Sequence, residues 1–202
     1  MDARQYAPAT QRNREPILKI LSEVLPTNSN VLEIASGTGE HAIFFASELK
    51  SCRWIPSDVN SLATESIVAW KNACPVDNLE LPLLIDVTQE NWQQQVKNHA
   101  INAIVNINMI HIAPWQACLG LIAGAGQILP DDGILYLYGP YKCDGEHTAP
   151  SNASFDRSLR DRNPLWGVRD LEEVVETAAA QNLKLQQVIS MPANNLSLIF
   201  SR

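Results

Sequence analysis

The sequence has no long hydrophobic run. None of its apolar stretches reaches the roughly 18 residues that a membrane-spanning helix needs. The opening stretch MDARQYAPATQRNRE contains no apolar segment that could act as a signal peptide. These absences argue against membrane-spanning and secreted proteins, so we expect a cytoplasmic protein that does not bind a membrane.

The sequence is also short of positive charge and of clustered metal ligands. Its 15 Lys and Arg residues are outnumbered by 22 Asp and Glu residues, giving a net charge of −7. Binding nucleic acid phosphates needs a basic surface, so we expect no nucleic acid partner. The 4 cysteines are not spaced as C-x-x-C and the 4 histidines are scattered. We therefore expect no metal site, and free thiols of which Cys143 is the most exposed.

The length and apolar content fit one domain. The 202 residues are 46% hydrophobic, enough for one substantial core, and we predict a single domain over residues 1–202. By composition, residues 1–12 are expected to be poorly ordered. Pro16 suits the first turn of a helix, and an apolar stripe continues from it to Val24.

Strand-like and helix-like runs alternate along most of the chain. The predicted strands are 31–35, 52–58, 79–86, 101–109 and 133–139, and the predicted helices between them follow the glycines near residue 40 and cover 61–73, 88–99 and the residues after Pro114. This order predicts an α/β fold with a parallel sheet and helices on both faces.

The C-terminal part follows a different pattern. A long polar loop over 141–164 precedes a helix that begins near Leu171. The two strand-like runs LKLQQVIS and NLSLIFS are separated only by MPAN, too short for a parallel crossover, so they are predicted to form an antiparallel hairpin. The hairpin would complete a Rossmann-like, seven-stranded and mostly parallel sheet.

A glycine turn follows the first predicted strand in LEIASGTGEH. Gly37 and Gly39 permit a tight turn and let a ligand approach the backbone closely. In an open α/β sheet, ligands bind beyond the carboxyl ends of the strands. A glycine pair that merely joins a strand to a helix is the plainer interpretation, and the pair alone does not decide between them.

Acidic residues end the next two predicted strands. Asp58 ends the second strand, where a carboxylate can accept both hydroxyls of a ribose. Asp86 ends the third strand and could accept a hydrogen bond from an adenine amino group. Either aspartate could instead cap a helix. Polar residues at three successive strand ends favour a nucleotide-type ligand.

Two cofactors fit this pattern. The run from Gly37 to Ala42 matches G-x-G-x-x-[GA], the dinucleotide fingerprint. Glu33, inside the first strand, favours S-adenosylmethionine, because its carboxylate suits a cationic amino-acid end and would repel a pyrophosphate. The helix before the first strand and the terminal hairpin point the same way.

These residues resemble the class I S-adenosylmethionine-dependent methyltransferases over nearly the whole chain. The family's acidic-x-G-x-G-x-G motif falls on Glu33 to Gly39, with Ala35 at the first glycine position. The resemblance implies a cofactor site made of Glu33, Ala35, Ser36, Gly37, Gly39, His41, Asp58, Val59, Asp86, Val87, Asn106 and Ile107.

A closer resemblance lies in the segments NREPIL, LEIASGTGEHA, NMIHIAPW, LYGPY, HTAPSNASFD, WGVRDLEEV and MPANN. Together they resemble one family of small methyltransferase-like proteins. That resemblance implies the fold and the cofactor and leaves the methyl acceptor open.

The catalytic candidates follow the fourth and fifth predicted strands. His111 could act as a base or orient the substrate, and it could equally be a loop histidine with a structural hydrogen bond. Asn108 could position substrate or cofactor, or satisfy backbone groups at a strand end. Tyr141 could contact the acceptor, although packing is the commoner role for such a tyrosine.

The sequence therefore predicts an S-adenosylmethionine-dependent methyltransferase that acts on a small molecule. The alternatives are a regulatory module that binds the cofactor without turnover and a nicotinamide-dependent oxidoreductase. No feature of the sequence sets an oligomeric state.

Overall fold

The computed structural model describes residues 2–202 and contains a seven-stranded sheet with the strand order β3-β2-β1-β4-β5-β10-β9. A small three-stranded sheet has the order β7-β6-β8. The contacts group the chain into two compact units, one running up to Asp86 with Gln94–Val105 and the other made of Val87–Gln93 with Asn106–Arg202. The prediction of a single domain stays a prediction.

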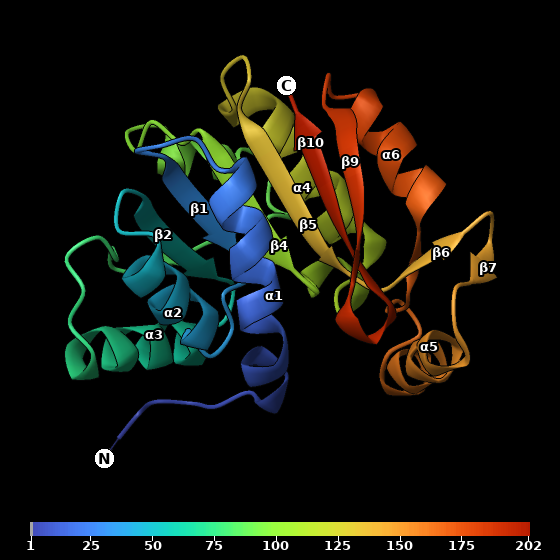
Figure 1. Ribbon diagram of the computed structural model, residues 1–202, viewed down its shortest axis with the longest axis horizontal. Helices are drawn as coiled ribbons and strands as arrows, with labels where there is room; N and C mark the ends of the chain where they lie inside the picture. Colours follow the sequence, from blue (N-terminus) through green and yellow to red (C-terminus); the bar gives the residue numbers. More distant parts are fainter. Residues whose placement is uncertain (1) are drawn as a thin grey trace. The chain divides into compact units, whose positions relative to one another are not determined.

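The first unit contains parallel strands with helices that contact one another. Its elements are α1 (Pro8–Val24), β1 (Asn30–Ile34), α2 (Glu40–Glu48), β2 (Arg53–Asp58), α3 (Ser61–Ala73) and β3 (Leu83–Leu84) (Figure 1). β1 pairs in parallel with β2, and β2 pairs in parallel with β3. β1 and β2 are almost fully buried, as expected for parallel strands covered on both faces. β4 (Ala103–Ile107) begins in this unit and ends in the other.

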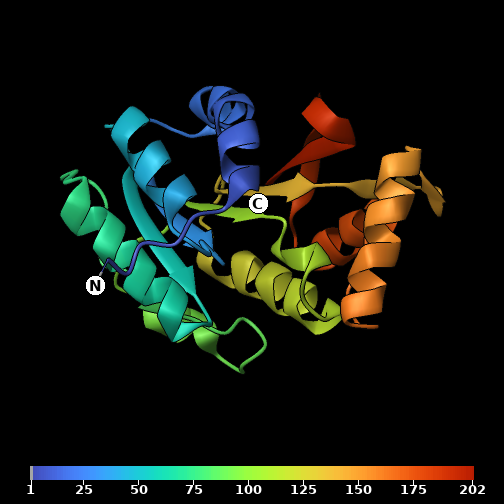
Figure 2. The ribbon, with the colours of Figure 1, turned by 90° about the horizontal axis from the view of Figure 1, so that it is seen from below.

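The N-terminal segment lies against α3 in the first unit (Figure 2). The backbone N–H of Gln5 donates to Ser66 Oγ at 2.8 Å, and Trp70 Nε1 donates to the Gln5 carbonyl at 3.1 Å. The Tyr6 ring meets the Trp70 ring edge-on. α1 begins at Pro8, so the predicted start at Pro16 was wrong.

Residues 2–12, for which composition suggested poor order, are thus placed by these contacts and by α1; Met1 lies outside the described residues.

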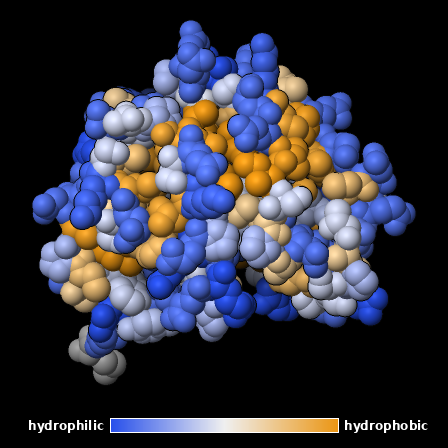
Figure 3. Space-filling model, in the orientation of Figure 1, coloured by the Kyte–Doolittle hydropathy of each residue, from blue (hydrophilic) through white to orange (hydrophobic). Residues whose placement is uncertain are grey.

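The second unit carries the C-terminal hairpin. Its elements are η2 (Met109–His111), α4 (Trp115–Ile128), β5 (Ile134–Gly139), β6 (Tyr141–Cys143), β7 (Glu146–His147), α5 (Pro150–Arg162), β8 (Arg169–Asp170), α6 (Leu171–Ala179), β9 (Lys184–Met191), η3 (Pro192–Asn194) and β10 (Asn195–Ser201). β10 is antiparallel to both β5 and β9, which confirms the predicted hairpin and, with the sheet order, the predicted fold class. Figure 3 shows apolar side chains gathered over β5, β10 and β9. On β9, the side chain of Val188 is exposed.

Three predicted elements were wrong in extent or type. The third strand, predicted over 79–86, is reduced to Leu83–Leu84, because Pro82 has no N–H to give to a ladder. The helix predicted over 88–99 is only the 3₁₀ helix η1 (Trp92–Val96), with the Trp92 indole donating to the Gly120 carbonyl. The predicted loop over 141–164 contains β6, β7 and α5, whose first residue, Pro150, suits a helix start.

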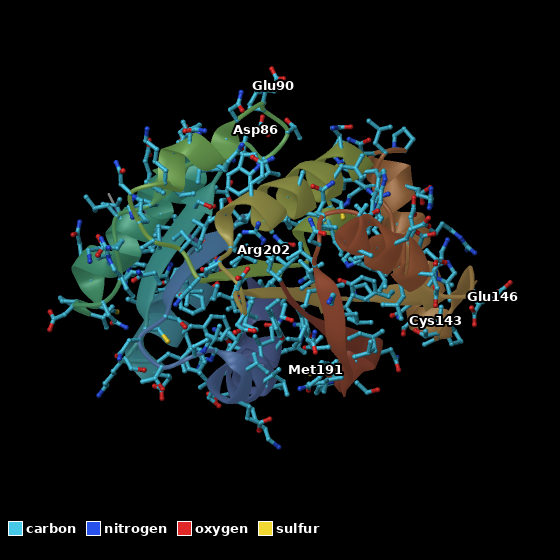
Figure 4. The ribbon with its side chains drawn as sticks, turned by 90° about the horizontal axis from the view of Figure 1, so that it is seen from above. Asp86, Glu90, Cys143, Glu146, Met191 and Arg202 are labelled. Atoms are coloured by element: carbon cyan, nitrogen blue, oxygen red, sulfur yellow. The ribbon has the colours of Figure 1, made fainter. Side chains whose placement is uncertain are left out.

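The prediction that Cys143 is the most exposed thiol was wrong. Cys143 is half-buried and pairs with Glu146 across β6 and β7 (Figure 4), whereas Cys74 is exposed. Cys74 terminates α3, a position that leaves its side chain at the end of the helix. All four thiols are free.

Candidate functional site

The glycine turn after β1 has a left-handed backbone at three positions. The φ angles are +59° at Ala35, +56° at Gly37 and +88° at Gly39. Glycine adopts such angles without the steric cost that a Cβ brings. Ala35 therefore stands where a glycine would be less strained, and that explains the glycine of the family motif at this position.

The two glycines of the turn have different roles, one in packing and one in leaving open space. A Cβ added to Gly39 would lie 2.8 Å from the Ile67 side chain, so this glycine lets α3 pack against the start of α2. A Cβ added to Gly37 would meet no atom within 4 Å, so the space beside it is open. Gly37 is thus the point at which a ligand can approach the backbone.

Asp58, at the end of β2, binds the glycine turn. Its carboxylate accepts a hydrogen bond from the Gly37 N–H at 2.9 Å and another from the Asn60 N–H at 2.9 Å. The cap of α3 is Asn60, whose side chain accepts from the Leu62 N–H. Asp58 is therefore not the helix cap, and one of the two interpretations of this residue is excluded.

Glu33, inside β1, is buried with its carboxylate bonded to Trp54. The Trp54 indole N–H donates to Glu33 Oε2 at 2.9 Å. Burial raises the pKa of Glu33 from its ordinary 4.5 to about 7, although the hydrogen bonds from Trp54 and Ser36 oppose the rise. Ser36 also donates its backbone N–H to the Ser57 carbonyl and so joins the turn to β2. Glu33, Ser36, Gly37 and Asp58 thus lie together.

Two further candidates lie at the edge of the first unit. Val59, which follows Asp58 in the sequence, is 60% exposed and carries an apolar side chain. Asp86 is half-buried at the end of the first unit. An exposed apolar side chain next to an acid is the surface that a nucleoside would cover.

His41 is directed toward α1. Its Nε2 lies 2.9 Å from Asn13 Oδ1, and its ring stacks on Phe45 with centroids 5.3 Å apart. Burial, with the charge of Arg14, lowers the pKa of His41 to about 4. This histidine is therefore neutral and joins α2 to α1, and its hydrogen bond and ring contact are directed away from Glu33 and Asp58.

The second unit holds the remaining cofactor candidates and the catalytic ones. Val87 packs on α4, because a Cβ on Gly120 would lie 1.9 Å from the Val87 carbonyl oxygen. Asn106 and Ile107 are buried at the end of β4. Asn108 has a left-handed φ of +66° and donates its N–H to the Tyr138 carbonyl at 2.8 Å.

His111 and Tyr141 are in contact and fully buried. Their rings meet edge-on with centroids 5.1 Å apart. Burial lowers the pKa of His111 to about 3, assisted by the charge of Arg169, and burial raises the pKa of Tyr141 well above its ordinary value. Both side chains are therefore neutral at physiological pH, and the low pKa makes His111 a weak proton acceptor, which counts against it as a general base.

Gly139 provides the space for His111. A Cβ on Gly139 would lie 2.3 Å from His111 Nε2 and 3.3 Å from Asn108 Oδ1. The structure thus brings Asn108 and His111 together around Gly139, with Tyr141 against the His111 ring.

Several site residues escaped sequence analysis. Arg169 contacts His111 from β8, Ser66 and Glu40 contact the N-terminal segment, and Asn60 caps α3. The Gly-Pro pair after a strand in LYGPY could have identified Gly139. The contact made by Arg169 is distant in sequence, and no local pattern signals it.

Two features are absent from residues 2–202. No helix there is long and apolar enough to cross a membrane. The same residues contain no group of three or more His, Cys, Asp or Glu side chains placed to hold a metal ion.

Solved structures with this fold include several methyltransferases. An O-methyltransferase family protein from Burkholderia thailandensis matches with a TM-score of 0.79 at 14% identity, over 96% of this chain and 57% of that one. An O-methyltransferase family 2 protein from Planctomyces limnophilus in complex with apigenin matches with a TM-score of 0.76 at 18% identity, over 96% and 60%. PigF with SAH matches with a TM-score of 0.74 at 9% identity, over 95% and 56%.

This chain thus spans less than two thirds of each of those proteins, and at such identities the likeness shows the fold, which is that of the class I methyltransferases. At the level of sequence, residues 4–202 match one family model, and the chain belongs to the family described as "Protein of unknown function (DUF938)".

Proposed function

We propose that this chain binds S-adenosylmethionine and transfers its methyl group to a small-molecule acceptor. The observation that carries the proposal is the open backbone at Gly37, whose N–H is bonded to the Asp58 carboxylate. Each carboxylate oxygen of Asp58 accepts one protein N–H and keeps a second lone pair for a ribose hydroxyl. Val59, the next residue in the sequence, offers an apolar surface to adenine.

The start of α2 favours this cofactor over a dinucleotide. A pyrophosphate binds at a helix N-terminus through free N–H groups and avoids negative charge. Here the first turn of α2 contains Glu40, a buried carboxylate that accepts the Ala7 N–H. The Gly37 N–H is already bonded to Asp58. Both features disfavour a phosphate and are compatible with an uncharged ribose and a zwitterionic amino-acid end.

The small-molecule part of the proposal rests on two observations. The net charge of −7 disfavours a nucleic acid acceptor. One structural relative, the Planctomyces protein, was solved with apigenin, a small aromatic compound. Methyl transfer itself breaks the methyl–sulfur bond as the bond from acceptor to methyl forms, and the sulfur keeps the electron pair.

Ligand-dependent stability tests the cofactor. A ligand at about 100 times its dissociation constant stabilises the folded state by roughly 2.7 kcal/mol. We expect S-adenosylmethionine and its demethylated product to raise the melting temperature and NADH to leave it unchanged. A rise with NADH alone would overturn the assignment in favour of the oxidoreductase alternative.

A turnover assay tests the reaction. Labelled S-adenosylmethionine, the protein and a metabolite extract should give a labelled small product. The rival function, a module that binds the cofactor without turnover, is favoured by the complete burial of His111 and Tyr141. Binding with no labelled product would support that rival, and labelled protein in place of a small product would refute the small-molecule acceptor.

A further inference from the structure

Arg169 bridges two backbone segments of the second unit. Its guanidinium donates hydrogen bonds to the carbonyls of Ile110 at 2.8 Å, Ala113 at 2.7 Å and Leu165 at 3.0 Å. It also lies over the Trp115 ring, 5.5 Å from the centroid. None of the salt bridges of the described residues involves this charge, and its side-chain hydrogen bonds go to these carbonyls.

The same segment fixes the protonation of the His111 ring. The Arg169 backbone N–H points to His111 Nδ1 at 3.4 Å, and the Gly167 N–H donates to the His111 carbonyl at 2.9 Å. A backbone N–H can only donate, so Nδ1 is the acceptor and the single proton of the neutral ring sits on Nε2.

The Nε2 atom of His111 makes no hydrogen bond within the described part of the chain. It is buried without a hydrogen-bond partner, as is the Tyr141 hydroxyl. It lies against Gly139, where an added Cβ would be 2.3 Å from it, and Asn108 Oδ1 lies beside the same position. A buried polar group without a partner destabilises the folded protein by about 1–3 kcal/mol. His111 and Tyr141, whose rings are in contact, each carry such a group, and this cost calls for a functional explanation.

We propose that Arg169 is a positioning residue that holds His111 as a hydrogen-bond donor through Nε2, so that His111 orients an acceptor oxygen that already carries negative charge. The inference rests on the proposed function and narrows its substrate class to oxygen anions, such as carboxylates. An anionic oxygen becomes neutral when it takes the methyl group from the sulfonium, and no proton has to move.

The charged and titratable groups that face His111 agree with this role. Arg169 on β8 contributes positive charge, and Tyr141 on β6 is held neutral by burial. Burial would raise the pKa of Asp156 on α5, but hydrogen bonds from the Val168 N–H and Arg160 lower it, so its negative charge is already matched. None of these groups can hold a proton removed from a substrate.

Nitrogen NMR of the histidines tests the positioning without any substrate. His111→Gln identifies the His111 signal by its loss. In the wild-type protein that signal should show the proton on Nε2 and no titration between about pH 5 and 8. A proton on Nδ1, or titration near the usual histidine value, would overturn the proposal.

Variants of Arg169 separate the effect of its charge on the His111 ring from the effect of its hydrogen bonds to the three carbonyls. Arg169→Met should allow the His111 ring to populate both tautomers, and loss of the charge should raise the pKa of the ring, which burial still keeps below its ordinary value. Arg169→Lys keeps the charge but cannot span three carbonyls, so it should mix the tautomers while the ring still resists protonation. A tautomer unchanged in both variants would refute the positioning role, and if Arg169→Met does not fold, Arg169→Lys decides alone.

Activity distinguishes a donor from a base. Glutamine can donate a hydrogen bond but cannot take up a proton, whereas alanine does neither. If His111 is a donor, His111→Gln should stay within about tenfold of wild type and His111→Ala should fall well below it. If His111 is a base, both variants should lose about 10²–10⁴-fold. A wild type without turnover would refute the proposed function, and the NMR result would still decide the positioning.

Discussion

The carboxylate of Asp58 accepts the backbone N–H of Gly37 at 2.9 Å, so the acid that ends β2 fixes the glycine turn that follows β1. Gly37 has a φ of +56° and open space beside it. The acid therefore fixes the backbone of the turn, and the open side of Gly37 is where we propose that the cofactor approaches.

Replacing Asp58 should weaken cofactor binding. Asp58→Ala removes charge-assisted hydrogen bonds, and we expect a loss of about 1.5–3 kcal/mol in S-adenosylmethionine affinity by calorimetry. The matched control is Asn60→Ala, which removes the α3 cap and should cost about 1 kcal/mol of stability with little change in affinity. A folded Asp58→Ala protein with wild-type affinity would show that the ligand lies elsewhere.

The stability of the protein should depend on the ionisation of Glu33. Its pKa in the folded protein, about 7, is above its ordinary 4.5, so the folded state holds the proton more tightly. The resulting stabilisation is complete below about pH 4.5 and is lost as the pH rises through 7. At about 1.4 kcal/mol per pKa unit the loss is roughly 3 kcal/mol.

Urea unfolding at pH 5 and pH 8 measures this loss. Glu33→Gln should remove most of the difference between the two pH values, whereas the exposed control Glu48→Gln should keep it. The assignment would be wrong if Glu33→Gln and wild type lost the same stability between those pH values.

Ala35→Gly should stabilise the protein. A left-handed alanine is strained by about 1–2 kcal/mol, part of which the greater freedom of glycine in the unfolded chain offsets. We expect a net gain of up to about 1 kcal/mol in thermal unfolding. Ala69→Gly, in the middle of α3, should instead lose about 1 kcal/mol. Equal losses in both variants would contradict strain at Ala35.

Ser66 should couple the N-terminal segment to the glycine turn. Its hydroxyl accepts the Gln5 N–H and donates to the Thr38 carbonyl at 2.7 Å. Ser66→Ala leaves both backbone groups without this partner and should cost about 1–3 kcal/mol, with faster amide hydrogen exchange at Gln5. Ser22→Ala, on an exposed turn of α1, should change stability by less than about 0.5 kcal/mol. Unchanged exchange at Gln5 would refute the coupling.

Local patterns in the sequence predicted the parallel strands, the hairpin and the place of Asp58, because each depends on alternation or on turn residues within a few positions. They missed the start of α1 at Pro8 and the contact of Tyr6 with Trp70 just before it, which joins residues far apart in the sequence. They also gave β3 too great a length, since Pro82 interrupts an otherwise apolar run.

The roles of the site residues depend on contacts that the sequence does not reveal. Which group caps α3 could not be read from the sequence, since Asp58 and Asn60 are both good caps and only the hydrogen bonds separate them. The neutral state of His111 depends on burial and on Arg169, far away in the chain. Contacts of this kind carry no periodic signal.

Gly139→Ala should displace His111, because the added methyl would lie 2.3 Å from its Nε2. Forcing a methyl into a packed site costs about 1–3 kcal/mol. His111→Ala frees that space, so the Gly139→Ala change should cost much less in a His111→Ala background. A double-mutant cycle by chemical unfolding measures the coupling, which we expect to exceed 0.5 kcal/mol in magnitude, as found for residues in contact. Additive effects would mean that the His111 ring does not occupy the space beside Gly139.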